Sequence, residues 1–97
     1  MMTVRYRNRA LAELLDFREH YDSLQGGKGE ELALLLSHSI RLVAAFPKMH
    51  AQGYRGLRHF KVRKFPILVY YRVRGHTVWI VAALHAARDQ RQALRGR

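Results

Sequence analysis

The second half of the chain is patterned for β-structure, and this limits the fold more than any other feature of the sequence. Apolar and basic residues alternate over Leu57–Phe65, and a run rich in β-branched and aromatic residues occupies Ile67–Val73. Arg74–Gly75 suits a tight turn, after which a third apolar run covers His76–Leu84. Pro66 lacks a backbone donor and is expected at a strand start or an edge. Three successive strands joined by short turns predict an antiparallel sheet.

The first half of the chain is patterned for one short strand and two helices. Alternation in Thr3–Tyr6 predicts the strand, and Asn8 is expected to cap the helix that follows. Apolar residues of that helix recur at spacings of three and four: Ala10, Leu14, Phe17, Tyr21 and Leu24. The glycine-rich segment 25–29 ends it, and a second helix is predicted over Glu30–Phe46, where Pro47 stops it.

These patterns together predict an α+β fold. The order is an N-terminal strand, a helical hairpin and three further strands, with a short helix or tail over Arg88–Leu94. The hairpin is expected to pack on one face of a mostly antiparallel β-sheet. We expect one domain over residues 1–97, because a chain of this length buries about two-thirds of its unfolded surface.

Two of these elements carry more apolar surface than one face can hold. Strict alternation places the last strand's Val78, Ile80, Ala82 and Leu84 on one face, and Trp79, Val81, Ala83 and His85 on the other. The second helix has an apolar face of Leu32, Leu35, Leu36, Leu42, Val43 and Phe46, while Leu34, Ile40, Ala44 and Ala45 lie outside it. Such a helix is expected to be covered by the first helix and the sheet, with a partner helix as the further alternative.

The charge of the chain points to an anionic partner. Eighteen Lys and Arg against seven Asp and Glu give a net charge of +11. Residues 32–88 contain no acid but ten cations: Arg41, Lys48, Arg55, Arg58, Lys61, Arg63, Lys64, Arg72, Arg74 and Arg88. A solvated basic surface is the simpler alternative, but so many unpaired cations favour a nucleic acid or an acidic protein as the partner.

Several classes of protein are disfavoured by the residues that are missing or badly spaced. There is no cysteine, and the six histidines are not at metal-ligand spacings, so neither a metal nor a cofactor is expected. The chain has no phosphate-binding glycine loop or HExxH motif. It shows no secretory signal and no apolar run long enough for a membrane span. A cytoplasmic protein without a membrane partner is the expectation.

One kind of catalytic site remains compatible with the sequence. Cleavage of RNA needs cations that stabilise the charge at phosphorus and a histidine that moves a proton. The candidate set is His59, Lys61, Arg63, Arg72, His85 and Arg88. Alternation predicts that His59, Lys61 and Arg63 share a strand face and that Trp79 lies with His85. The alternative for each residue is structural, and no catalytic residue is assigned outright.

The sequence resembles the RelE/ParE superfamily of type II toxins over nearly all of its length. Phe46-Pro47 closes the helical hairpin, and GLRHFKVRKFPILVYYRVRGHTVWIVAALHAARD then follows the family's order of strands and turns. The ending LHAARD is closest to the ParE branch. The resemblance implies two helices on an antiparallel sheet. It also implies a cognate acidic antitoxin that wraps the toxin in a toxin–antitoxin hetero-oligomer.

The resemblance directs particular residues toward particular partners. An antitoxin helix and its carboxylates would be contacted by Leu34, Leu35, Ile40, Arg41, Arg58, Lys61 and Arg63. The toxin's target would be contacted by His85, Arg88 and Arg91. Arg88 and Asp89 are also expected to fix the C-terminal turn, and His85 to be a hydrogen-bonded residue at a strand end.

The two branches of the superfamily imply different targets. Members that resemble RelE are ribosome-dependent mRNA endoribonucleases with a catalytic Tyr or His near the C-terminus, whereas ParE-like members inhibit DNA gyrase and are not enzymes. The last tyrosine here is Tyr71, so the C-terminal tyrosine is missing. This departure favours a ParE-like gyrase inhibitor. The RelE-like endoribonuclease is the alternative, and a nucleic-acid-binding module without toxin activity is a third.

Overall fold

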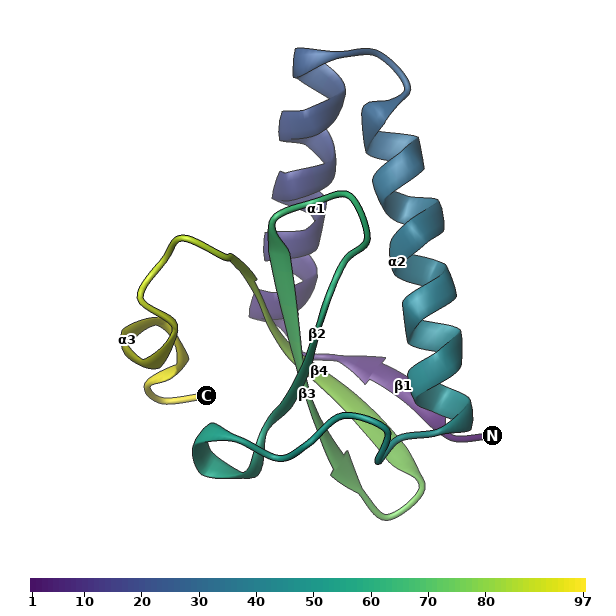
Figure 1. Ribbon diagram of the computed structural model, residues 1–97, viewed down its shortest axis with the longest axis vertical. Coiled ribbons are helices and arrows are strands. Elements are labelled where there is room, and N and C mark those ends of the chain that lie inside the picture. Colours follow the sequence, from purple (N-terminus) through teal and green to yellow (C-terminus); the bar gives the residue numbers. More distant parts are fainter.

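The computed structural model describes residues 1–97 and confirms the predicted order of elements (Figure 1). In chain order these are β1 (Thr3–Tyr6), α1 (Asn8–Leu24), α2 (Lys28–Ala45), the 3-10 segment η1 (Tyr54–Gly56), β2 (Arg58–Lys61), β3 (Ile67–Arg74), β4 (Thr77–His85) and α3 (Gln90–Leu94). None of the helices combines the length and the apolarity that a membrane crossing requires.

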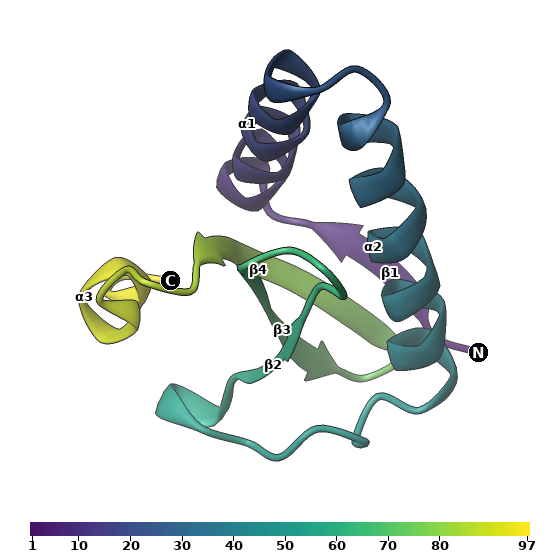
Figure 2. The ribbon, with the colours of Figure 1, turned by 45° about the horizontal axis from the view of Figure 1, so that its top comes forward.

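The strands form one mixed sheet in which β4 is an inner strand. The spatial order is β1-β4-β3-β2. β1 runs parallel to β4, with Thr3 opposite Thr77 and Tyr6 opposite Ile80, whereas the other two pairings are antiparallel. The predicted mostly antiparallel α+β fold is therefore confirmed. The α1–α2 hairpin lies over one face of the sheet, and α3 lies apart from it beyond the end of β4 (Figure 2).

Two apolar clusters, one on each side of the sheet, form the core. The larger cluster joins the hairpin to the sheet and contains 14 buried residues, among them Leu14, Leu32, Val43 and Tyr71. The smaller cluster contains 7 buried residues and joins the outer face of the sheet to Ala93 and Leu94 of α3. We call the hairpin side the inner face and the α3 side the outer face.

A β-bulge in β4 makes the predicted strict alternation wrong for this strand. Tyr70 pairs with Ala82 but Tyr71 pairs with Ile80, which leaves Val81 as the extra residue. Such a bulge reverses the side on which later residues point. The larger cluster accordingly contains Val78, Ile80 and Ala83, whereas Val81, Ala82 and Leu84 lie with Trp79 in the smaller one. His85 therefore does not share a face with Trp79.

The turn between α1 and α2 is closed by the side chain of Asp22, which the sequence patterns did not predict to be a capping residue. Asp22 Oδ1 of α1 accepts hydrogen bonds from the backbone N–H groups of Gly27 and Gly29, at 3.0 and 3.2 Å, and so caps the start of α2. The predicted boundary was wrong, because Lys28 and Gly29 belong to α2 rather than to the loop. Asn8 is likewise the first residue of α1 and makes no capping hydrogen bond.

The face that α2 buries also differs from the predicted one. Its buried residues are Gly29, Leu32, Ile40, Val43 and Ala44. Ile40 is only 9 % exposed, whereas Leu34, Leu42 and Phe46 are 66 %, 39 % and 63 % exposed. Leu34 and Ala45, which were predicted to lie outside the apolar face, are exposed as expected, whereas Ile40 and Ala44 are buried against the prediction.

β2 is shorter than the predicted strand Leu57–Phe65. It ends at Lys61, and Lys64 takes a left-handed φ of 69° in the turn that follows. Val62 N donates to Ile67 O at 2.9 Å, which closes this turn while Val62 and Phe65 stay buried. Arg63 therefore lies in a turn, and it does not extend a strand face shared by His59 and Lys61.

Gly29 is predicted to be essential for the close contact of the two helices. A Cβ atom at Gly29 would lie 2.6 Å from Arg18 O and 2.9 Å from Asp22 Cβ. Because backbone cannot move away cheaply, Gly29→Ala should lower the free energy of unfolding by about 1–3 kcal/mol in urea denaturation. Gly26→Ala is the matched control, since a Cβ there meets nothing within 4 Å. Equal stability of the two variants would contradict this account of the packing.

Candidate functional site

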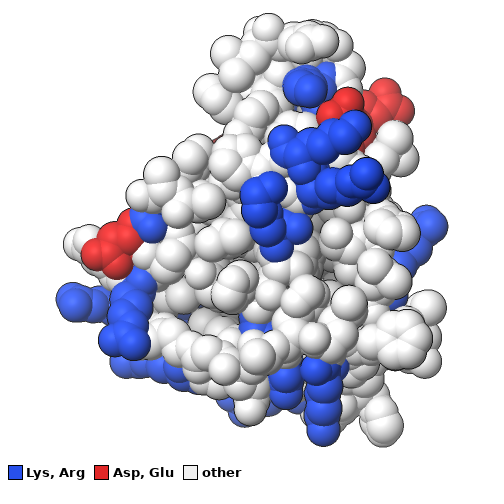
Figure 3. Space-filling model, in the orientation of Figure 1, with Lys and Arg blue, Asp and Glu red and all other residues white.

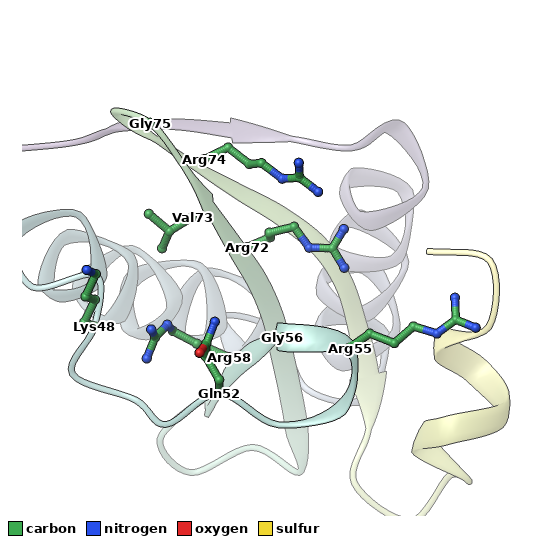
Figure 4. A pocket seen from close by; sticks show the side chains of 9 residues that line it. All are labelled: Lys48, Gln52, Arg55, Gly56, Arg58, Arg72, Val73, Arg74 and Gly75. Carbon is green, nitrogen blue, oxygen red and sulfur yellow. The ribbon is translucent and has the colours of Figure 1, made fainter.

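The largest hollow of the molecule lies beside the free edge of β3. β2 pairs only with Leu68–Tyr71, so the last residues of β3 have no neighbour on that side. An open cavity of about 690 Å³ occupies this place (Figure 4). Its lining is Lys48, Gln52, Arg55, Gly56, Arg58, Arg72, Val73, Arg74 and Gly75. Five of these nine residues are cations and none is an acid, so the cavity favours an anionic ligand.

The loop that forms one wall of the cavity is held by its own backbone. Gly53 N donates to Leu57 O at 2.7 Å, and the buried Leu57 anchors this end of the loop. Arg55 and Gly56 both take left-handed conformations, with φ of 54° and 76°. Such a φ is costly for an arginine, and it persists only where the surroundings fix it. The Arg55 guanidinium lies 5.5 Å from the Tyr54 ring centroid.

Of the remaining cations, Arg58, Arg72 and Arg74 come from the neighbouring strands β2 and β3, and Lys48 comes from the loop after α2. Figure 4 shows Arg72 and Arg74 extending to the same side of β3, while Val73 extends to the other side. Arg58 Nη1 donates to His50 O at 2.5 Å, which ties the loop to the start of β2. Burial lowers the pKa of His50, and the charge of His59 lowers it further. His50 is therefore neutral at pH 7 and adds no charge to the cavity.

Basic and acidic side chains are separated over the surface. On the face seen in Figure 3, Lys and Arg gather around the β2–β3 turn and along the lower margin, while the few acids lie toward the sides. The acids belong to α1, the start of α2 and the cap of α3: Glu13, Asp16, Glu19, Asp22, Glu30, Glu31 and Asp89. No group of three His, Cys, Asp or Glu residues is placed to hold a metal ion.

The six residues that were candidates for RNA cleavage do not meet in one place. Arg72 lines the basic cavity. His59 and Lys61 lie on β2, where the His59 ring packs 5.0 Å from the Tyr70 ring, and Arg63 lies in the following turn. His85 and Arg88 line a separate cleft of about 350 Å³ on the inner face, beside α1.

The cleft of His85 is itself unsuited to a phosphate. The carboxylates of Glu13 and Asp16 line it together with His20 and His85. His85 Nδ1 accepts a hydrogen bond from Ala87 N at 3.1 Å. Asp89 caps α3 by accepting from Gln92 N at 3.2 Å, and Arg88 N donates to His85 O. The expectations that His85 is a hydrogen-bonded strand-end residue and that Asp89 fixes the C-terminal turn are thus confirmed.

The residues predicted to contact partners are spread over three regions. Leu34 and Arg41 are exposed on α2, and Leu35 is half-buried, but Ile40 lies in the core. Lys61 and Arg63 are exposed at the end of β2 and in its turn. Arg91 lies on α3, with its guanidinium 5.3 Å from the Tyr54 ring centroid, away from the cleft of His85 and Arg88.

Sequence reasoning counted the cations but did not find how they cluster. Lys48, Arg55 and Arg74 belong to the acid-free half, yet none of them was assigned to a site. Their only signal was the absence of acids around them. The Arg7 guanidinium lies 4.2 Å from the Trp79 ring centroid, which joins the start of α1 to β4, and this contact had no signal in the sequence.

One further ion pair connects the chain's end to the hairpin. Arg97 donates to both Glu13 oxygens, at 2.6 and 2.8 Å, and Ala83 N donates to Glu13 Oε1 at 3.1 Å. Arg97 also donates to Val81 O, the bulged residue of β4. Burial by itself would raise the pKa of Glu13, but the hydrogen bonds from Arg97 and Ala83 and the charges of Arg97 and Arg9 together lower it.

The fold and the sequence place the chain among known toxins. Residues 4–90 match the family described as the ParE toxin of the type II toxin-antitoxin system, parDE, and the chain belongs to this family. Its fold is similar to that of a chain in the solved structure "Chromosomal ParDE TA system from P. aeruginosa". The TM-score is 0.74 at 20 % sequence identity, and the match covers 88 % of this chain and 96 % of the other. No curated protein matches the sequence.

The Glu13–Arg97 pair predicts a pH-dependent contribution to stability. Because the folded state lowers the pKa of Glu13 below its ordinary value of 4.5, the contribution is present above that pH and is lost as pH falls through the folded pKa. Glu13→Gln should lower the free energy of unfolding by about 1.5–3 kcal/mol at pH 7. The difference from the parent chain should shrink below about pH 4, as measured by urea denaturation.

Glu19→Gln is the control for this experiment, because Glu19 lies on the same helix and makes no hydrogen bond or ion pair in the structure. A difference between the parent chain and Glu13→Gln that stayed constant from pH 7 to pH 3 would contradict the role given to the ionised carboxylate.

Proposed function

We propose that this ParE-family toxin inhibits DNA gyrase without cleaving RNA and is neutralised by a cognate acidic antitoxin. The family match over residues 4–90 carries the proposal. The dispersal of the RNA-cleavage candidates supports the gyrase branch over the endoribonuclease branch. A general acid and the cations that stabilise a phosphorane must act on the same phosphate, whereas His85 and Arg72 line different hollows of the molecule.

The exposed apolar part of α2 supports a docking site for the antitoxin. Leu34, Leu42 and Phe46 are exposed, and Arg41 lies on the same helix. An amphipathic antitoxin helix would cover these side chains. The carboxylates of that helix would pair with Arg41 on α2 and with Lys61 and Arg63 in and beside the β2–β3 turn. Ile40, by contrast, is buried in the toxin's own core and makes no part of this proposed contact.

The segment that follows β4 is the proposed contact with the target. His85, Arg88 and Arg91 lie within seven residues of one another in the sequence and present basic groups on both sides of the C-terminal turn. Their role in this proposal is recognition of gyrase. His85 then serves as a contact residue and not as an acid or a base.

The proposed activity is tested by two assays on one preparation. Purified chain is added to DNA gyrase with relaxed plasmid and ATP, and in parallel to translating ribosomes with a defined mRNA. We expect supercoiling to be lost, or cleaved plasmid to accumulate, while the mRNA stays intact. A boiled sample of the same preparation controls for contaminating nuclease. Cut mRNA with normal supercoiling would overturn the proposal in favour of the endoribonuclease alternative.

The antitoxin site is tested by adding charge to the exposed face of α2. Leu34→Glu/Leu42→Glu should weaken the complex with the co-expressed antitoxin by about 100-fold, because two buried apolar contacts would be replaced by carboxylates facing an acidic partner. Leu15→Glu/Leu24→Glu is the matched control, since Leu15 and Leu24 are 56 % and 67 % exposed on α1. Isothermal titration gives the affinities. An equal effect of both changes would place the antitoxin elsewhere.

A further inference from the structure

The outer face of the sheet carries cations from elements that are far apart in the sequence. We call this surface the outer basic face, and it consists of Arg5, Arg7, Arg55, Arg72, Arg74 and Arg91. The sheet register aligns three of its residues in one row, because Trp79 of β4 is opposite Arg5 of β1 and Arg72 of β3. Adjacent strands are about 4.8 Å apart, so the two arginines flank Trp79 across about 10 Å.

Hollows on either side of this row extend the surface. The basic cavity contributes Arg55, Arg72 and Arg74 on one side. A second hollow of about 440 Å³ lies on the other side and is lined by Arg5, Tyr6, Arg7, Asn8 and Trp79. The one acid in the outer layer is Asp89, whose side chain caps α3. The six guanidinium groups make no ion pair within the chain, and so their mutual repulsion is relieved only by an external anion.

The composition of this face favours nucleic acid over an acidic protein. A protein interface has an apolar centre, whereas an interface with nucleic acid is polar and strongly positive. Of the large exposed apolar side chains, only Tyr6 at the end of β1 lines a hollow of this face. The others are Met1 before β1, Leu11, Leu15 and Leu24 on α1, Leu34 and Leu42 on α2, and Phe46 and Met49 after it. The basic cavity has a single apolar lining residue, Val73. An acidic protein segment would find little to bury here.

The aromatic rings of the outer face favour a duplex over a single strand. Proteins that hold single strands present free rings on which the bases stack. Here the guanidinium of Arg7 lies 4.2 Å from the Trp79 centroid, and those of Arg55 and Arg91 lie 5.5 and 5.3 Å from the Tyr54 centroid. Tyr70 packs against His59 at 5.0 Å. Because these rings are already packed and only Tyr6 is left exposed in the second hollow, the surface offers mainly charge to phosphates and no series of rings on which successive bases could stack.

We infer that the outer basic face binds the phosphate backbone of double-stranded DNA without reading its sequence. The guanidinium groups contact phosphates on the strands bordering a groove, and bound counterions are released from the duplex. Arg72 and Arg74 form the centre of the contact, and Arg5 lies at its far end. The six arginines include none of the residues proposed for the antitoxin on α2 and in the β2–β3 turn, although Arg58, a predicted antitoxin contact, lines the same basic cavity. Of the residues proposed for the target, this binding uses only Arg91.

The inference is tested by fluorescence anisotropy of a labelled 20-base-pair duplex titrated with purified chain at several salt concentrations. The logarithm of the affinity should fall linearly with the logarithm of salt, with a slope of about −4. Arg72→Gln/Arg74→Gln should weaken binding at least about tenfold at 0.1 M salt and reduce the magnitude of the slope by about 2. Arg5→Gln should reduce it by about 1.

Arg18→Gln/Lys28→Gln is the matched control, because it removes the same number of positive charges from the helical hairpin. There, Arg18 lies among acidic residues and Lys28 forms a weak ion pair with Glu31. This control variant should keep nearly all of the binding. Thermal unfolding verifies that each variant is folded. Equal losses in the two double variants would overturn the inference, since net charge alone would then explain binding. Tighter binding of a single strand, or equal competition by polyglutamate of the same charge, would overturn it too.

Discussion

The fold depends on β4 being buried on both of its faces. This strand is hydrogen-bonded to β1 on one edge and β3 on the other, and it supplies residues to both apolar clusters. A strand of regular alternation could do this, but the bulge at Val81 changes which residues go to which side. Beyond the bulge, the small side chain of Ala83 packs in the cluster beneath the hairpin. Leu84 packs in the other cluster, with Ala93 and Leu94 of α3. Arg97 then donates to Val81 O, so the chain's end is tied to the same irregularity.

Burial of both faces also separates the two kinds of surface that remain exposed. On the hairpin side the exposed residues include leucines of α1 and α2, which suit an amphipathic protein partner. On the α3 side the exposed residues include arginines, three of which pack on aromatic rings, and guanidinium groups suit phosphates. A net charge of +11 would be compatible with either partner alone. Their separation by the sheet would let one toxin carry the proposed antitoxin site and the proposed duplex-binding face on different residues.

The sequence was sufficient for the order of elements, the short strand Thr3–Tyr6, the helical hairpin and the family. It was insufficient wherever a single residue interrupts the regular alternation of side chains between the two faces of a strand. The bulge at Val81 leaves no mark in an apolar run, and the turn at Lys64 interrupts an alternation that continues in the sequence as far as Phe65. The site was harder to predict, because Arg5, Arg55 and Arg72 are brought together by strand register and loop shape. Composition favoured an anionic partner, and only the structure shows which cations lie together.

The most direct test of two separate surfaces is a heteronuclear NMR titration of the ¹⁵N-labelled chain with a 20-base-pair duplex. Trp79 is the chain's single tryptophan, and its indole N–H gives one isolated signal on the outer face. The account predicts that the duplex shifts this signal and the amide signals of Arg72 and Arg74, while those of Leu34 and Leu42 on α2 stay in place. Shifts confined to α2 with an unchanged Trp79 signal would contradict it.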